Sequence, residues 1–164
     1  MRKVDKSCEP KDFTKFKRRE NPREWKDIDP ISSKLKTHML EEQDNYCPYC
    51  EKHITYNIND KTPPNPHIDH IWPQSKFPKK RFDYNNLILS CSSEGSSKKQ
   101  YTGGFHKDNV FDEKLFINPV TENPMDYVTH SATGDIISII DNSNNVAYKR
   151  AIYTIKLLNL NEKN

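Results

Sequence analysis

Residues 67–73 place two histidines and an aspartate in a short apolar run that ends at a proline. The run reads His67, Ile68, Asp69, His70, Ile71, Trp72, Pro73. Pro73 cannot donate to a sheet ladder and restricts the residue before it, so the sequence predicts a strand that stops here. Side chains alternate along a strand, which puts His67 and Asp69 on one face and His70 on the other, unless the chain bends at the strand end.

The adjacent carboxylate and imidazole at the end of this strand suit phosphodiester cleavage. Hard divalent cations such as Mg²⁺ prefer oxygen ligands, so Asp69 can hold one while the ring of His70 stays free. A free imidazole with a pKa near ~6.5 is a general base at neutral pH. A base that deprotonates water and a metal that stabilises the leaving oxygen together cleave phosphodiesters. The competing interpretation is that both histidines are hydrogen-bonded residues without a catalytic role.

Three of the four cysteines suit a structural metal site. Cys47 and Cys50 form a C-x-x-C pair with a proline between them, the pattern of a zinc knuckle. Asn85 and Asn86 begin a second apolar segment, and Cys91 ends it. Because the two predicted strands are close enough in sequence to form a hairpin, a zinc ion on the cysteines would hold both ends of the motif.

The composition predicts one small domain. The chain has 164 residues, of which 33% are hydrophobic and 30% charged, so its core is small and a metal would help to hold it. No stretch approaches the ~18 apolar residues of a membrane span, and the N-terminus lacks an apolar signal-peptide centre. We therefore expect a soluble, cytoplasmic protein without disulfides and without a membrane partner.

Residues 1–29 are polar, and the sequence predicts an extended arm with at most a helical turn around Trp25. Such an arm is expected to dock onto a partner. Asp29 and Pro30 are typical of a helix start, and apolar residues at helical spacing extend the predicted helix to about residue 43.

A C-terminal extension is expected over residues 110–164. A strand is predicted at residues 115–119, a hairpin at residues 126–140 that turns at residues 132–135, and a closing helix at residues 144–161. The buried face of this closing helix is expected to consist of Tyr148, Ile152, Ile155, Leu158 and Leu160.

In this order and spacing, the motifs resemble those of the HNH endonucleases, whose ββα-metal site takes its name from such His and Asn positions. The resemblance is closer to the HNH subunit of Septu-type and retron-associated anti-phage systems, often called PtuB, and covers nearly the whole chain. It is carried by CPYCE at 47–51, HIDHIWPQSKF at 67–77, YNNLILSC at 84–91, INP at 117–119 and LNLN at 158–161.

The resemblance implies an α+β fold with a ββα-metal core at residues 30–109, and it implies a role for each matching residue. His70 would be the general base, and Asp69 would bind the catalytic metal, Mg²⁺ or another divalent cation. Asn86 would orient the catalytic loop or His70, with Asn85 as the less favoured neighbour. His67 would be either a further ligand or a group that holds Asp69.

The resemblance also implies a function, a substrate and a partner. The chain would be a metal-dependent DNA endonuclease and the cutting subunit of a complex with an ABC-type or SMC-like ATPase of the PtuA type. Basic side chains would hold flanking DNA phosphates without reading sequence. These are Lys76, Lys79, Lys80, Arg81, Lys98 and Lys99.

The sequence departs from the family pattern after the second strand. Relatives of this type usually carry a second metal-binding pair there, but the expected partner of Cys91 falls at Ser96 or Ser97. Serine is a poor zinc ligand, so the zinc site is weakened or lost unless another residue completes it. His106 is the favoured replacement, and Cys8 is the alternative. The catalytic metal would rest on Asp69, water, and Glu94 or His67.

Two other classes of function stay open. The serines favour a non-catalytic zinc-finger-like subunit that binds nucleic acid or acts as an adaptor. A thioredoxin-like redox protein would explain CPYC at 47–50, but no βαβ pattern surrounds that motif.

Overall fold

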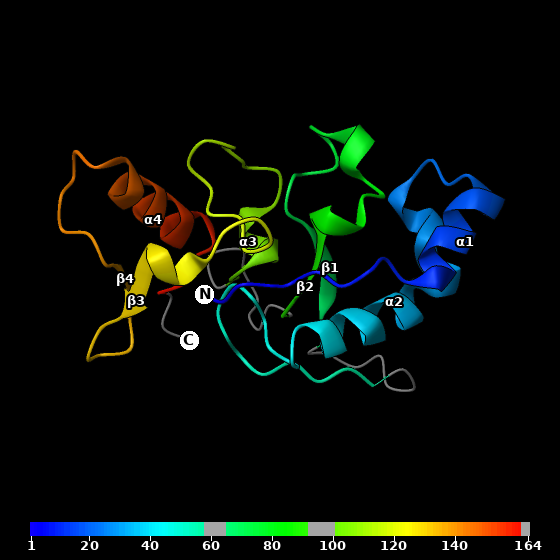
Figure 1. Cartoon of the computed structure of the whole chain (residues 1–164), viewed down its shortest axis with the longest axis horizontal. Coiled ribbons are helices and arrows are strands. Elements are labelled where there is room, and N and C mark those ends of the chain that lie inside the picture. Colours follow the sequence, from blue (N-terminus) through cyan, green and yellow to red (C-terminus); the bar gives the residue numbers. More distant parts are fainter. Residues whose placement is uncertain (58–64, 92–100, 162–164) are drawn as a thin grey trace.

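The computed structural model describes residues 1–57, 65–91 and 101–161. The elements lie along one elongated body, with α1 and α2 at one end, the β1–β2 hairpin in the middle, and α4 with β3 and β4 at the other end (Figure 1). Helices and small antiparallel sheets together confirm the α+β class. The elements are α1 (Lys11–Glu20), α2 (Asp29–Glu42), β1 (His67–His70), β2 (Leu87–Ser90), α3 (Gly104–Lys107), β3 (Val128–His130), β4 (Ile136–Ser138) and α4 (Val146–Leu157), with 3-10 helices η1 (Trp25–Ile28), η2 (Pro78–Lys80), η3 (Tyr84–Asn86) and η5 (Pro124–Asp126).

The predicted hairpin of two short strands is confirmed. β1 and β2 pair antiparallel, with His67 opposite Ser90 and His70 opposite Leu87. Every side chain of β2 is buried, because α2 covers it and β1 lies beside it. The helix α3 packs against β1 and completes a small ββα unit.

Helix α2 begins and ends close to its predicted bounds. Asp29 is its first residue, and Leu35 and Met39 are its buried positions. Gln43, which follows the helix, holds β2 in place: its side chain donates to the Leu89 carbonyl at 2.8 Å and accepts from the Leu89 backbone N–H at 2.8 Å. The helix and the hairpin therefore form one packed centre.

The prediction of an extended N-terminal arm is wrong. Residues 11–20 form α1, whose Phe13 and Phe16 are buried in the core. Two aromatic residues three apart share one helical face, and their burial against α2 overrides the polar composition around them. The polar composition of residues 11–20 did not indicate this helix, because Phe13 and Phe16 are its two buried side chains.

The first residues of the chain are also part of the packed structure. The backbone N–H of Arg2 donates to the Pro48 carbonyl at 3.0 Å, and that of Val4 donates to the Pro119 carbonyl at 2.8 Å. Lys6 forms a 2.8 Å ion pair with Glu42 in which both side chains are nearly buried. Residues 1–29 are therefore built into the fold, and their predicted role in docking a partner stays a prediction.

The C-terminal lobe confirms the hairpin and the closing helix. β3 and β4 pair antiparallel from Val128 opposite Ser138 to His130 opposite Ile136. The predicted stripe of α4 is partly wrong: Ile155 and Leu158 are buried, whereas Tyr148 and Ile152 are half-buried. The buried face instead includes Ala151 and Thr154, because the helix turns Tyr148 and Ile152 towards a groove beside β4.

The strand predicted at residues 115–119 does not form. The segment is turn and irregular backbone, and it is held by α4 instead of by a neighbouring strand. The N–H of Ile117 donates to the Thr154 hydroxyl at 2.9 Å, and the buried Phe116 packs with the core. The backbone N–H of Ile117 therefore binds the Thr154 side chain. In the predicted strand it would have bound the backbone of a neighbouring strand.

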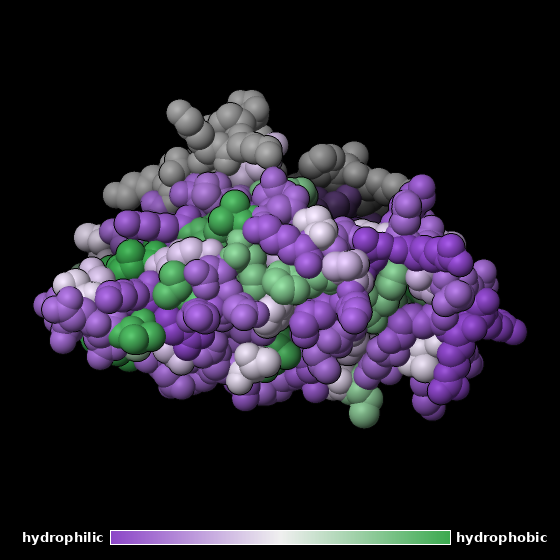
Figure 2. Space-filling view, turned by 90° about the horizontal axis from the view of Figure 1, so that it is seen from above, coloured by the Kyte–Doolittle hydropathy of each residue, from purple (hydrophilic) through white to green (hydrophobic). Residues whose placement is uncertain are grey.

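The surface differs between the two ends. Figure 2 shows hydrophilic side chains over the end that carries α1 and α2, and more hydrophobic side chains at the end that carries the C-terminal lobe. Exposed apolar residues there include Ile137, Ile139 and Val146. Among the described residues, no helix has the length and apolar character needed to cross a membrane.

Candidate active site and metal centre

A small cavity of about 220 Å³ lies at the end of β1. The residues that line this cavity belong to η1, to β1 and the segment that follows it, and to α3 and the turn after α3. Its side chains include Trp25, His67, Asp69, His70, Phe105 and Asp108.

His70 is held in one orientation by a backbone carbonyl. Its Nε2 lies 3.0 Å from the carbonyl oxygen of Arg81, and the edge of its ring contacts Trp25 at a centroid distance of 4.3 Å. Since a carbonyl only accepts, Nε2 carries the proton, and Nδ1 of the neutral ring keeps its lone pair. Burial lowers the pKa of His70, although the Arg81 carbonyl opposes this. The ring is therefore neutral at pH 7 and can accept a proton.

Asn86 braces the connection between β1 and β2. Its side chain accepts from the Trp72 backbone N–H at 2.7 Å and donates to the carbonyls of Trp72 at 3.1 Å and Lys80 at 2.9 Å. It is 2% exposed, so water does not replace these partners. Asn85 is exposed, and its backbone N–H donates to the Asp83 side chain at 3.0 Å. The structure thus gives the two asparagines different environments.

Asp69 lies beneath the cavity between two partners that the sequence did not reveal. The hydroxyl of Tyr49 donates to its Oδ2 at 2.7 Å, and the ammonium of Lys107 lies 3.4 Å from the same oxygen. Lys107 also donates to the His70 carbonyl at 2.8 Å. Burial and the charge of Asp69 raise the pKa of Tyr49 well above its usual value, so the phenol stays a donor.

His67 and Asp69 converge on Gly104, the first residue of α3. A Cβ added to Gly104 would lie 2.7 Å from Asp69 Cγ and 2.8 Å from His67 Nε2, so only glycine permits this approach. The ring of His67 packs on Phe105 at 3.8 Å between centroids, and its buried Nδ1 has no hydrogen-bond partner within residues 1–57, 65–91 and 101–161. Burial lowers the pKa of His67, which keeps the imidazole neutral.

These residues fit a divalent cation with few protein ligands. A carboxylate and a neutral imidazole that approach one point are suitable donors. No group of three acidic, histidine or cysteine ligands surrounds Asp69 among the described residues. Mg²⁺ commonly binds through one or two carboxylates and fills its other positions with water and phosphate oxygens.

The three predicted zinc ligands lie together at the other end of the hairpin. The sulfur atoms of Cys47, Cys50 and Cys91 all lie within 4.8 Å of one another, and those of Cys50 and Cys91 are 3.4 Å apart. Burial opposes ionisation of Cys47, but hydrogen bonds from the other two thiols lower its pKa well below its usual value. A cluster that stabilises a thiolate fits a zinc ion.

The structure does not bring a fourth predicted ligand to this cluster. His106 lies outside it, and its Nδ1 is hydrogen-bonded to the Leu157 carbonyl at 2.9 Å. Cys8 is exposed and also lies outside it. Glu94, Ser96 and Ser97 are outside the described residues. A fourth ligand is thus not found in the part of the chain that the structure describes.

The predicted phosphate-binding residues have different surroundings. Lys76 and Lys79 are exposed, whereas the ammonium of Lys80 lies 4.8 Å from the centre of the Trp72 ring. Arg81 has an internal role, because its guanidinium donates to the Arg23 carbonyl and its own carbonyl binds His70. Lys98 and Lys99 lie outside the described residues.

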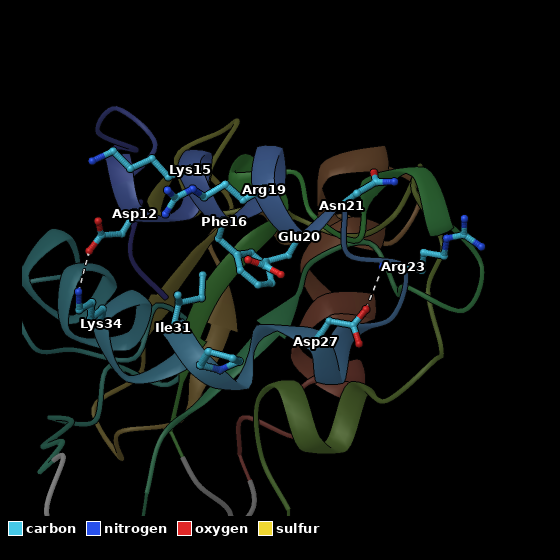
Figure 3. Close-up of a pocket in the computed structure, with 11 residues that line it drawn as sticks. Asp12, Lys15, Phe16, Arg19, Glu20, Asn21, Arg23, Asp27, Ile31 and Lys34 are labelled. Atoms are coloured by element: carbon cyan, nitrogen blue, oxygen red, sulfur yellow. Dashed lines mark hydrogen bonds and ion pairs between the residues drawn. The ribbon is translucent and has the colours of Figure 1, made fainter.

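A larger groove of about 870 Å³ lies between α1 and α2, and neither His67 nor His70 lines it (Figure 3). Lys15, Arg19 and Arg23 line it, but acidic side chains line it too. Asp12 pairs with Lys34 at 3.0 Å across the groove. The lining of the groove carries both signs of charge, and none of its side chains is among the unpartnered buried polar groups of the described residues.

We expect Asn86→Ala to destabilise the chain, because it leaves a buried N–H and two carbonyls without their partner. Unfolding in urea should show a loss of about 2–4 kcal/mol. The neighbouring Asn85→Ala is the matched control and should change stability by less than about 0.5 kcal/mol. Equal effects of the two substitutions would contradict the bracing role of Asn86.

We expect the purified chain to contain at most about one zinc ion, bound by the three cysteines of the cluster. Elemental analysis should show that Cys50→Ser loses most of the metal and that its thermal unfolding temperature falls. Cys8→Ser should behave like the unchanged chain, since Cys8 lies outside the cluster. A zinc content that is the same in both variants would contradict this assignment.

Comparison with known families gives a match to the middle of the chain. Residues 47–93 match the family model described as HNH endonuclease, and the match includes β1, β2 and all three clustered cysteines. A search of curated proteins found no match to the chain. The chain therefore carries an HNH endonuclease domain over residues 47–93.

Proposed function

We propose that the chain is a metal-dependent DNA endonuclease in which His70 activates the attacking water. The observation that carries this proposal is the hydrogen bond from His70 Nε2 to the Arg81 carbonyl at 3.0 Å. It fixes the tautomer in which Nδ1 is the proton acceptor, beside the cavity that Asp69 also lines. The HNH match over residues 47–93 supports a nuclease independently of this geometry.

In the proposed mechanism, each neighbour of His70 has a separate role. Nδ1 takes a proton from water, and the Arg81 carbonyl stabilises the imidazolium that results. Trp25 limits rotation of the ring, because its own ring meets that of His70 nearly at right angles. Asn86 acts one step further away by holding the segment that presents the Arg81 carbonyl.

Asp69 and His67 would hold the catalytic cation. Such a cation would neutralise charge on the scissile phosphate and on the leaving oxygen. Lys76 and Lys79 are exposed next to this region of the sequence and would contact flanking phosphates. Lysine contacts of this kind carry no sequence information, so the proposed cleavage is not specific for a base sequence.

Plasmid nicking in the presence of Mg²⁺ or Mn²⁺ tests the proposal. His70→Ala should reduce the nicking rate by at least about 100-fold, the usual effect of a lost general base, while the circular dichroism spectrum is retained. His130→Ala is the matched control, since His130 is exposed on β3 in the other lobe. Undiminished nicking by folded His70→Ala would refute the assigned base.

A non-catalytic zinc-binding adaptor for nucleic acid is the second candidate. It is favoured by one observation, the engagement of Asp69 by Tyr49 and Lys107. The two candidates differ in the nicking assay. An adaptor would bind plasmid without any metal-dependent nicking, and His70→Ala would leave binding unchanged.

The proposed biological role is the cutting subunit of an anti-phage complex with an ATPase of the PtuA type. This part rests on the sequence resemblance alone. Cells that express both proteins should plate phage at reduced efficiency, and the ATPase should co-purify with the chain. His70→Ala should abolish protection but retain co-purification. Protection that persists in this variant would contradict the role of a cutting subunit.

A further inference from the structure

We propose that Lys107 is a fixed positive charge that competes with a divalent cation for Asp69, so that the free chain binds such a cation weakly. This inference rests on the cation site proposed above. It concerns the affinity of that site and adds a residue that lies outside the HNH match at residues 47–93.

The contacts of Lys107 place its ammonium at the carboxylate. Nζ lies 3.4 Å from Asp69 Oδ2 and donates to the His70 carbonyl at 2.8 Å. The residue is 0% exposed, so water cannot solvate its charge. A buried ammonium needs a nearby anion, and Asp69 is the carboxylate that it contacts. Asp69 is thus already neutralised by a side chain of the same protein.

The helix that carries Lys107 is held in place on both sides. The N–H of Gly103 donates to the Leu158 carbonyl at 2.8 Å, and His106 binds the Leu157 carbonyl at 2.9 Å. On the other side, Gly104 touches His67 and Asp69 so closely that no larger residue fits. The backbone of α3 is therefore fixed beside β1, which keeps the buried side chain of Lys107 next to Asp69.

Charge repulsion follows from this arrangement. A divalent cation on Asp69 would lie within a few ångströms of the ammonium, in a region screened far less than bulk water. The repulsion is well above thermal energy at such a distance, so it lowers the affinity of the empty site. A DNA phosphate next to the cation would offset the excess positive charge. Cation and nucleic acid should then bind cooperatively, each raising the affinity for the other.

Mn²⁺ titration of the full-length, zinc-loaded chain without DNA tests this inference. Free Mn²⁺ is measured by electron paramagnetic resonance for the unchanged chain, Lys107→Gln and Lys107→Met. Both substitutions remove the charge, and glutamine keeps a donor for the His70 carbonyl. We expect both variants to bind Mn²⁺ at least about 10-fold more tightly than the unchanged chain. Lys114→Gln, at an exposed lysine, is the matched control and should have no effect.

A second substitution shows where the ion binds. Asp69→Asn in the Lys107→Gln background should remove the added affinity. Equal Mn²⁺ affinity of the unchanged chain and both Lys107 variants overturns the role of Lys107 but leaves the cation site standing. If no form of the chain binds Mn²⁺, both the cation site and this inference are overturned.

A measurement on the unchanged chain applies even where neither Lys107 variant folds. Mn²⁺ broadens the NMR signals of nearby imidazole rings. At about 0.1 mM Mn²⁺, below the millimolar range of weak binding, we expect the ring signals of His67 and His70 to stay sharp. Broadening of both at this concentration overturns the inference, and so do ring signals that stay sharp up to about 10 mM Mn²⁺. Ring signals that broaden only in the millimolar range support it.

Discussion

The side chain of Asn86 is the contact on which the candidate active site depends. β1 and β2 pair over only four residues each, and the long segment that joins them has no sheet partner. Asn86 ties Trp72 at the start of this segment to Lys80 near its middle. The next carbonyl, that of Arg81, receives the His70 ring. The side-chain amide of Asn86 thus holds the backbone that places the Arg81 carbonyl. Because this carbonyl binds Nε2 of His70, Nδ1 is the ring nitrogen that is left to accept a proton.

The cysteine cluster and the cavity are connected through Tyr49. This residue lies between Cys47 and Cys50 in the sequence, is 0% exposed, and reaches Asp69 with its hydroxyl. A metal that orders the cysteines would therefore also fix the donor to Asp69. The residues of CPYC would thus serve both proposed sites, the cysteines by holding a metal and Tyr49 by binding Asp69.

Local patterns predicted the central hairpin, α2 and the C-terminal hairpin and helix, but they missed α1. The hairpin was predictable because Pro73 ends one apolar run and Asn86 begins the other, and α2 because Pro30 and its apolar spacing agree. Helix α1 was missed because its burial depends on Phe13 and Phe16 meeting α2. Lys107 could not have been found from its neighbours in sequence, since its partner Asp69 belongs to a different element. Contacts between distant elements carry no local signal.

The observed contact of Asp69 with Lys107 and its proposed role as a metal ligand oppose each other. As the anion beside a buried ammonium it stabilises the fold, because removal of either partner would leave a charge without compensation. As a metal ligand Asp69 would serve the reaction, but only if a divalent cation can bind next to the ammonium of Lys107. The tight contact at Gly104 keeps all these groups close, so neither role can be improved by moving α3 away. If Asp69 also holds a cation as proposed, a nucleic-acid phosphate would supply the added negative charge, and the contact that holds the fold together would make the proposed site depend on its substrate.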